Sequence, residues 1–136
     1  MLQLGLLLKQ VHGDVESAEE CYRNAIKHDQ QYAHAWLNLG VLLKTERRDF
    51  AGAEQAYRRA IKIDPLEPWV HYNLGRLLLE ARDDVAGADA LFRKFVKLAP
   101  DADEAQKARD AVDAARKQHR HGPQIEEQND ISLSER

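Results

Sequence analysis

The sequence has 136 residues, of which 43% are hydrophobic and 32% charged, and its formal net charge is −3. The length leaves no room for a second large domain. Residues 122–136 carry four acidic residues and one arginine, so residues 1–121 are neutral overall and lack the positive surface of a nucleic-acid-binding protein. No apolar run reaches the roughly 18 residues of a membrane span. The single cysteine, Cys21, excludes an internal disulfide. We expect a cytoplasmic protein with no nucleic-acid or membrane partner.

The chain begins with a leucine-rich stretch, residues 1–10, that contains the first of three Leu-Gly pairs. This stretch lacks the basic flank and the small-residue cleavage site of a signal peptide, so we interpret it as folded protein. The pairs recur every 35 residues, as Leu4-Gly5, Leu39-Gly40 and Leu74-Gly75. A fixed period of this length predicts supersecondary units that are stable only when they stack on one another.

Each repeat contains two amphipathic helical patterns. In the second repeat, residues 31–46 carry apolar side chains at spacings of three and four, as one face of a helix requires. A second helix is predicted from Asp49 to Pro65, where proline ends it because its nitrogen cannot donate to the helical hydrogen bonds. Asp14, Asp49 and Asp84 occupy equivalent positions and are predicted N-caps, each contributing about 1 kcal/mol.

The glycines of the three Leu-Gly pairs fall inside predicted helices, where glycine costs about 0.8–1 kcal/mol relative to alanine. Close approach of the two helices in each repeat would offset that cost. We expect Ala18, Ala53 and Ala88 to provide the matching small surface on the second helix.

Residues 35–65, AWLNLGVLLKTERRDFAGAEQAYRRAIKIDP, resemble the tetratricopeptide repeat. The matching residues are, in order, Trp36, Leu39, Gly40, Leu43, Ala53, Tyr57, Ala60 and Pro65. The resemblance covers residues 1–100 and implies an all-α fold, a right-handed α-solenoid of antiparallel helix pairs with seven helices in total. Every repeat here has one extra residue between its helices, which predicts a longer first helix or a longer turn. Arg48 and Asp83 replace the family's turn glycine, and His71 replaces its tryptophan, which predicts weaker contacts there.

Residues 101–120 predict the seventh helix, whose thin apolar stripe would cover the last repeat. The expected organisation is a repeat domain over residues 1–121, with repeats at about 1–30, 31–65 and 66–100 and a capping helix at 101–120. Phe95 stands where the other repeats have alanine and is expected to fill the space against this helix. Residues 122–136 have few apolar residues and predict a disordered acidic tail. This tail could also occupy the groove of its own or a neighbouring molecule.

The resemblance places the ligand groove on the concave surface, which the first helix of each repeat lines. Carried over by register, the candidate groove residues are Gln3, Leu37, Asn38, Val41, Lys44, Trp69, Tyr72, Asn73 and Arg76. Their apolar and basic side chains predict a protein or peptide partner with apolar anchors and acidic residues.

Three carboxamides share one register in this groove, at Gln3, Asn38 and Asn73. A carboxamide can both donate to and accept from a peptide backbone, so the row predicts peptide binding. The alternative is that these side chains bond neighbouring helices. Trp69 and Tyr72 are candidate anchors, because large aromatic side chains dominate binding hot spots. Their alternative role is to cap the interface between repeats two and three.

The predicted function is a non-catalytic protein–protein interaction module. The alternative is a structural assembly module that self-associates or docks through its first repeat, where Leu2 and Leu6 are surplus apolar residues, or a fragment of a longer array. We expect no enzyme activity, cofactor or metal. The histidines have no metal-ligand spacing, no histidine is placed to activate Cys21, and no glycine-rich phosphate loop occurs.

Overall fold

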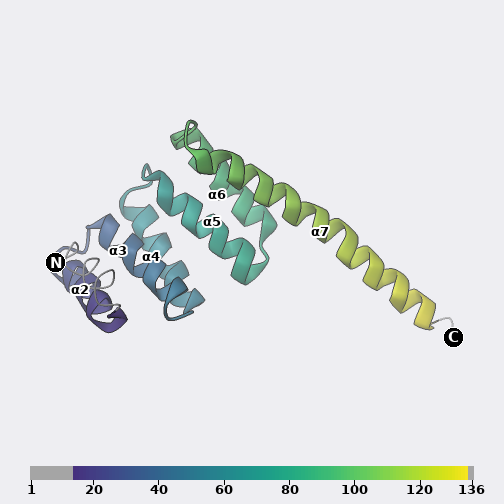
Figure 1. Cartoon of the computed structure of the whole chain (residues 1–136), viewed down its shortest axis with the longest axis horizontal. Helices are drawn as coiled ribbons and strands as arrows, with labels where there is room; N and C mark the ends of the chain where they lie inside the picture. The colour runs from purple at the N-terminus through teal and green to yellow at the C-terminus, as the bar shows by residue number, and fades with distance from the viewer. Residues whose placement is uncertain (1–13, 135–136) are drawn as a thin grey trace.

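The computed structural model describes residues 14–134, with side chains to residue 118, as six α-helices joined by short loops (Figure 1). The helices are α2 (Val15–His28), α3 (Ala33–Thr45), α4 (Phe50–Ile63), α5 (Pro68–Arg82), α6 (Val85–Leu98) and α7 (Asp103–Ser134). No strand occurs in this part of the chain, and the predicted all-α fold is confirmed. The first of the seven predicted helices falls in residues 1–13, outside the described residues, together with Leu2, Gln3 and Leu6.

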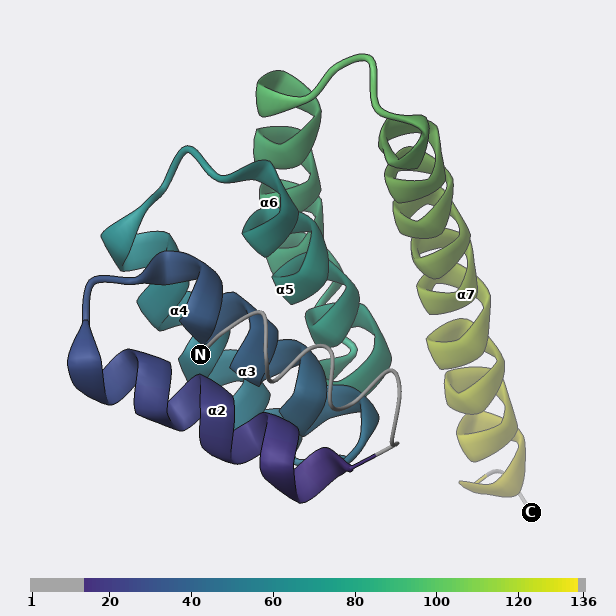
Figure 2. The same ribbon diagram turned by 60° about the vertical axis from the view of Figure 1, so that its left-hand side comes forward.

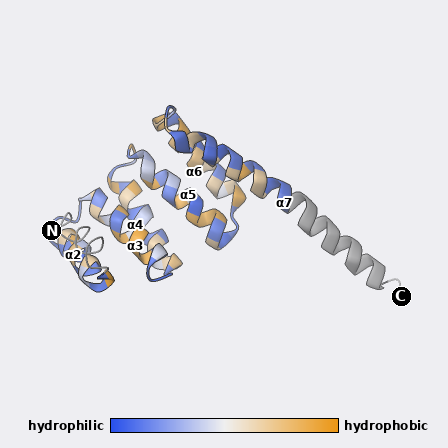
Figure 3. Ribbon diagram, in the orientation of Figure 1, coloured by the Kyte–Doolittle hydropathy of each residue, from blue (hydrophilic) through white to orange (hydrophobic). Residues whose placement is uncertain are grey.

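The helices stack as antiparallel pairs. α3 packs against α4, and α5 packs against α6, so repeats two and three are each a helical hairpin. Neighbouring hairpins contact each other through α4 and α5, and α7 covers α6 at the C-terminal end (Figure 2). Buried hydrophobic residues of α2 to α7 form one core cluster. The described half of α7 is largely hydrophilic (Figure 3). None of the described helices combines the length and the apolar character needed to cross a bilayer.

The predicted N-caps are confirmed. Asp14, Asp49 and Asp84 each accept a hydrogen bond from the backbone N–H three residues later, at 3.0, 2.9 and 2.9 Å. Each carboxylate thereby satisfies one of the N–H groups that have no partner within the helix, and it meets the positive end of the helix dipole. The second helix of every described repeat therefore starts at the same register.

The predicted close approach within each hairpin is also confirmed, although the closest group is an aromatic ring. A Cβ added to Gly40 would lie 2.6 Å from Cε1 of Tyr57, and one added to Gly75 would lie 2.7 Å from Cε1 of Phe92. Ala53 contributes its backbone carbonyl oxygen, 3.3 Å from the position of the Gly40 Cβ. Glycine is needed because the ring of the second helix lies directly against the backbone of the first.

The extra residue of each repeat is accommodated in two ways. In repeat two, α3 ends at Thr45 and the turn to α4 is longer, whereas in repeat three α5 continues to Arg82 and the turn is shorter. Both predicted solutions therefore occur, one in each repeat. Both turns place a residue other than glycine in the left-handed region, Arg48 at φ 52° and Asp83 at φ 54°. L-residues are strained there because Cβ approaches the following carbonyl oxygen.

This backbone geometry reverses the usual preference for alanine over glycine at position 48. We expect Arg48→Gly to be more stable than Arg48→Ala by about 1 kcal/mol, because only glycine adopts positive φ without strain. Both variants lose the contact of the Arg48 guanidinium with the Phe50 ring, so the comparison isolates the backbone. Thermal unfolding measures the order. At the exposed helical control position Glu20, the Glu20→Ala variant should be more stable than Glu20→Gly by a similar amount. The same order of alanine and glycine at both positions would contradict the turn geometry.

His71 keeps the hydrogen bond of the tryptophan that it replaces. In repeat two, Nε1 of Trp36 donates to the carbonyl oxygen of Gln30 at 3.0 Å, and in repeat three Nε2 of His71 lies 2.7 Å from the carbonyl oxygen of Pro65. The carbonyl acceptor places the proton on Nε2. The expected weakening is therefore confined to Nδ1, which is buried and has no hydrogen-bond partner among the described residues.

Ion pairs join each described repeat to the following helical unit, through acidic residues that recur every 35 residues. In each of these ion triads, an acid on the second helix of a repeat pairs with the arginine four residues later and with an arginine of the following helical unit. The triads are Glu19 with Arg23 and Arg47, Glu54 with Arg58 and Arg82, and Asp89 with Arg93 and Arg116. Hydrogen bonding to Arg23, opposed by burial and reinforced by Arg47, lowers the pKa of Glu19. Exposed ion pairs contribute little stability each, so their main consequence is a shared register.

The last helix is longer than predicted. Its predicted end lies near residue 120, with a disordered segment predicted at 122–136, whereas α7 continues to Ser134 and extends away from the repeats (Figure 1). The prediction of disorder rested on the small number of apolar residues, but this segment is rich in glutamate and glutamine, which have high helix propensity. Ala105, Ala108 and Val112 are buried, as the predicted stripe requires.

Candidate functional site

A cavity of about 470 Å³ lies between α5 and α7, and one residue of α6 also lines it. Its wall includes Tyr72, Arg76, Leu79, Glu80, Phe92 and Lys107. Tyr72 and Arg76 are among the predicted groove residues, and the structure brings them together with the aromatic ring of α6 and a lysine of α7. The cavity therefore combines an apolar wall with basic side chains.

Glu80 joins the first helices of repeats two and three. One carboxylate oxygen lies 2.8 Å from Nζ of Lys44 on α3, and the other lies 3.3 Å from a guanidinium nitrogen of Arg76 on α5. Lys44 and Arg76 were both predicted to make the groove positive, and Glu80 offsets one of these two charges. With Lys107 on the opposite wall, the cavity keeps an excess of positive charge.

These contacts shift the titration of Glu80. Burial, the largest single influence, acts to raise the pKa of Glu80, but the hydrogen bond and charge of Lys44 and the charge of Arg76 together outweigh it, so the net effect lowers the pKa. A lowered pKa in the folded state means that Glu80 stabilises the fold above the ordinary glutamate pKa. This contribution is lost as the pH falls through the lower, folded-state value.

The variant Lys44→Ala tests this linkage. We expect it to move the pKa of Glu80 upward, because it removes both a hydrogen bond and a nearby positive charge. Carbon-detected NMR titration of the Glu80 carboxyl measures the shift. The loss of stability relative to wild type should be largest at neutral pH and should disappear as both states become protonated. Lys62→Ala, an exposed control on α4, should leave Glu80 unchanged; an unchanged Glu80 in Lys44→Ala would contradict the ion pair.

Four aromatic rings form a cluster beside the cavity. The Tyr72 ring contacts the rings of Phe92 and Phe95, with centroids 5.9 and 5.0 Å apart, and the Arg76 guanidinium lies 5.8 Å from the Tyr72 centroid. Trp69 meets Tyr72 edge-on at 5.8 Å and Phe95 at 5.2 Å. These four rings belong to α5 and α6, the two helices of repeat three. They hold Tyr72 in a fixed orientation on the cavity wall.

Trp69 also leaves part of its surface open. Its side chain is 39% exposed, whereas Phe95 beneath it is fully buried. The ring is therefore already oriented by packing and still offers area to a partner, as a binding anchor requires. Phe95 was expected to pack against the capping helix, and the ring contacts show that it packs under Trp69 and Tyr72.

The two described members of the carboxamide row, Asn38 on α3 and Asn73 on α5, are both half-buried. Neither side chain forms a hydrogen bond with another residue in the described part of the chain, so the alternative role of bonding neighbouring helices receives no support there. Gln3, the third member, lies outside the described residues. Asn73 precedes Arg76 by three residues and therefore shares its helix face with the cavity wall.

Leu37 and Val41, the apolar groove candidates on α3, differ in exposure. Leu37 is only 7% exposed and belongs to the hydrophobic core, while Val41 is half-buried and packs against that core. Leu37 therefore contributes packing and offers little surface to a ligand. Leu37 was assigned to the groove by its repeat register. The register identifies a helix face but does not show which residues of that face are covered by neighbouring helices.

Phe92 and Ala111 are not among the predicted groove residues, although both line the cavity. The signal for Ala111 is its position beside the apolar stripe of α7, three residues after Ala108. Among the side chains that the structure describes, no three histidine, cysteine, aspartate or glutamate residues gather as a metal site would require.

The family model of the tetratricopeptide repeat matches residues 7–68 and, in a second register, residues 43–103. The two matches together span most of the chain. The chain belongs to the tetratricopeptide repeat family. A comparison with curated protein sequences found no match.

Solved structures of such repeat domains superpose on this chain. The type III secretion translocator chaperone SycD of Yersinia enterocolitica is 17% identical with a TM-score of 0.76, and the match covers 88% of this chain and 83% of SycD. PcrH, solved in complex with the chaperone binding region of PopD, is 21% identical with a TM-score of 0.73, covering 86% and 89%. The Arabidopsis OM64 TPR domain is 23% identical with a TM-score of 0.74, covering 83% and 91%. At these identities the likeness concerns the fold.

Proposed function

We propose that this chain is a non-catalytic protein-interaction module whose concave groove binds a segment of a partner protein with apolar anchors and acidic residues. The observation that carries the proposal is the cavity between α5 and α7, where Tyr72, Leu79 and Phe92 provide apolar surface beside Arg76 and Lys107. The excess positive charge favours a ligand with carboxylates. The apolar wall favours one with a large hydrophobic side chain.

The carboxamides of Asn38 and Asn73 extend this recognition to the partner's backbone. Both are half-buried and have no hydrogen bond within the described residues, so they can bond a peptide without first breaking an internal contact. Because α3 and α5 are held together through the Lys44–Glu80 pair, the two carboxamides stay in a fixed relation. Preorganisation of this kind reduces the entropy that binding costs the receptor.

Two of the related folds were solved with peptides. SycD has been solved with a peptide of the translocator YopD, and PcrH with the chaperone binding region of PopD. These partners belong to those proteins. They support the proposal only in that the same fold can hold a peptide.

The test is a selection of peptides displayed as a random library, followed by affinity measurements on the best binder. We expect peptides with a large apolar residue beside carboxylates, and we expect Asn38→Ala with Asn73→Ala to weaken their binding by about tenfold or more, from two lost hydrogen bonds. Asn24→Ala, a half-buried asparagine on α2, is the matched control and should not change the affinity. Selection of basic peptides, or equal affinity in the double variant, would contradict the proposal.

A further inference from the structure

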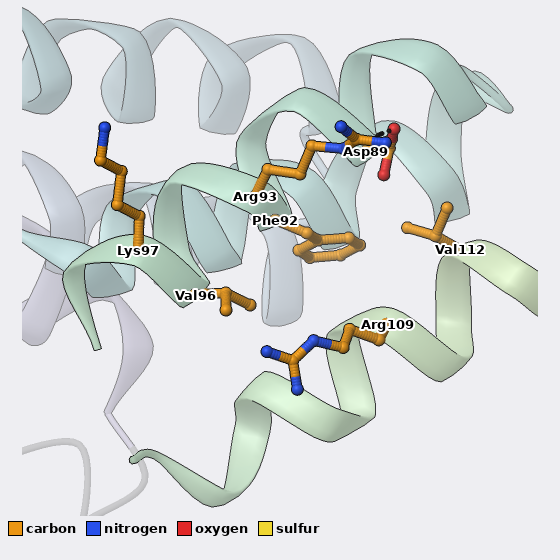
Figure 4. Close-up of a pocket in the computed structure, with 7 residues that line it drawn as sticks. All are labelled: Asp89, Phe92, Arg93, Val96, Lys97, Arg109 and Val112. Carbon is orange, nitrogen blue, oxygen red and sulfur yellow. Dashed lines mark hydrogen bonds and ion pairs between the residues drawn. The ribbon is translucent and has the colours of Figure 1, made fainter. Parts of the chain in front are cut away.

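A second cavity, of about 240 Å³, lies between α6 and α7 (Figure 4). Phe92 and Val96 of α6 and Val112 of α7 form its apolar floor, and Asp89 and Arg93 lie at one side. The α7 residues that line this second cavity differ from those that line the cavity between α5 and α7, so the second cavity opens on the other side of α7. The two cavities share Phe92, and all their other lining residues differ.

The change of residue types between the last repeat and the capping helix explains why this cavity exists. One repeat earlier, Leu74 and Leu77 of α5 are fully buried. Thirty-five residues later the sequence has Arg109 and Val112. Arg109 is exposed, and Val112 is smaller than leucine. Together they leave unfilled the space that two leucines would occupy.

The rim of the cavity carries positive charge that the described residues do not neutralise. Asp89 is shared between Arg93 at 3.1 Å and Arg116 at 2.7 Å, so it is already engaged by two arginines. Lys97 and Arg109 line the same cavity, and neither pairs with a carboxylate in the described part of the chain. A carboxylate next to an apolar side chain is therefore the chemical group that this site fits.

We propose that this cavity binds the acidic C-terminal segment, residues 122–136, of a second copy of the chain. This segment has four acidic residues against one arginine, and it contains Ile125, Ile131 and Leu133 among them. An aliphatic side chain of the segment fills the apolar floor, and its acidic neighbours meet Lys97 and Arg109. Its charge is opposite to that of the rim, and its apolar residues match the floor.

The segment that enters the cavity comes from another molecule. α7 runs past the cavity as one continuous helix, and its C-terminal end lies far from the repeats in both views (Figures 1 and 2). A chain therefore cannot return its own C-terminal segment to the cavity without breaking this helix. Two copies that exchange these segments form a closed, two-fold pair, because each uses the same two surfaces.

Sedimentation velocity of the full chain over a range of concentration and salt tests the proposal. We expect a concentration-dependent dimer that weakens as salt rises, because the rim contacts are ionic and exposed. Lys97→Glu with Arg109→Glu should weaken the dimer about tenfold or more. The control, Lys62→Glu with Lys94→Glu, changes the net charge equally at exposed positions outside the cavity and should not. A monomer at all concentrations, or a dimer insensitive to the cavity variant, would overturn the proposal.

Mixing two variants provides the decisive measurement. The chain with Lys97→Glu and Arg109→Glu should self-associate about tenfold or more weakly than wild type, and so should the chain with Glu126→Lys and Glu127→Lys. Mixed, they should form a heterodimer, because each acidic surface then meets a basic one. Absence of the heterodimer would refute the exchange. Loss of self-association in Leu2→Glu with Leu6→Glu, with normal behaviour of both charge variants, would assign it to the first repeat instead.

Discussion

Replacing Gly40 with leucine is expected to destabilise the chain by about 1 to 3 kcal/mol. The new Cβ would lie 2.6 and 2.7 Å from two carbons of the Tyr57 ring, which is too close for any pair of carbons to remain in place. The Tyr57 side chain is only 1% exposed and lies in the core cluster, so its ring has little room to move away. The helices of repeat two would have to separate.

The comparison with alanine separates sterics from helix propensity. Gly40→Ala gains about 0.8–1 kcal/mol of intrinsic propensity but still introduces the clashing Cβ, so its stability should fall between wild type and Gly40→Leu. Ala51→Leu, at an exposed position of α4, should change little. Thermal and urea unfolding measure all three. In a double-mutant cycle, Tyr57→Ala should remove most of the penalty of Gly40→Leu; an additive result would contradict the contact.

The roles of the recurring residues were predictable because each role is determined by local contacts within one hairpin. Asp49 and Asp84 are N-caps wherever the second helix must start, and Gly40 and Gly75 are required wherever an aromatic ring meets a helix backbone. These constraints act within one hairpin, over about 35 residues of sequence. A single sequence with aligned repeats therefore contains enough information to predict them.

Contacts between repeats were less predictable. The ion triads recur at one register, and the equivalent positions Glu19, Glu54 and Asp89 are all acidic, yet the pattern predicts pairing only once the next helix is placed beside them. His71 shows the reverse case. His71 forms the same hydrogen bond as Trp36 because both occupy the same backbone position in their repeats. The sequence does not reveal this bond, because the two residue types differ.

For the candidate groove, the register gave residue positions but not the exposure of each residue. Tyr72 and Arg76 line the cavity between α5 and α7, whereas Leu37 is buried. The cavity itself depends on α7, whose residue types differ from those of the repeats at equivalent positions. The same change of residue types places Arg109 beside the cavity between α6 and α7. Interfaces that involve the capping helix therefore had to be observed.

Phe95→Ala should be the most damaging single substitution proposed for this chain, at about 3 to 5 kcal/mol. The repeat pattern alone suggests the opposite, since alanine stands at the equivalent positions Ala25 and Ala60 and the change would restore the family residue. The structure explains the reversal. Phe95 is fully buried, and the rings of Trp69 and Tyr72 lie on it at centroid distances of 5.2 and 5.0 Å. Alanine would leave both rings above an empty space.

The substitution also separates two roles of this aromatic cluster. Leu98→Ala, at a position of α6 that is 36% exposed, is the control and should cost much less. Unfolding by urea measures the loss, and a cycle with Trp69→Ala should show coupling of about 0.5 to 1.5 kcal/mol between the two rings. A loss below about 1 kcal/mol would contradict the cluster.

Because Phe95 orients Trp69 and Tyr72, Phe95→Ala should also weaken peptide binding in the groove, even where the chain remains folded. If Phe95 were only structural, the affinity of the folded fraction would stay unchanged.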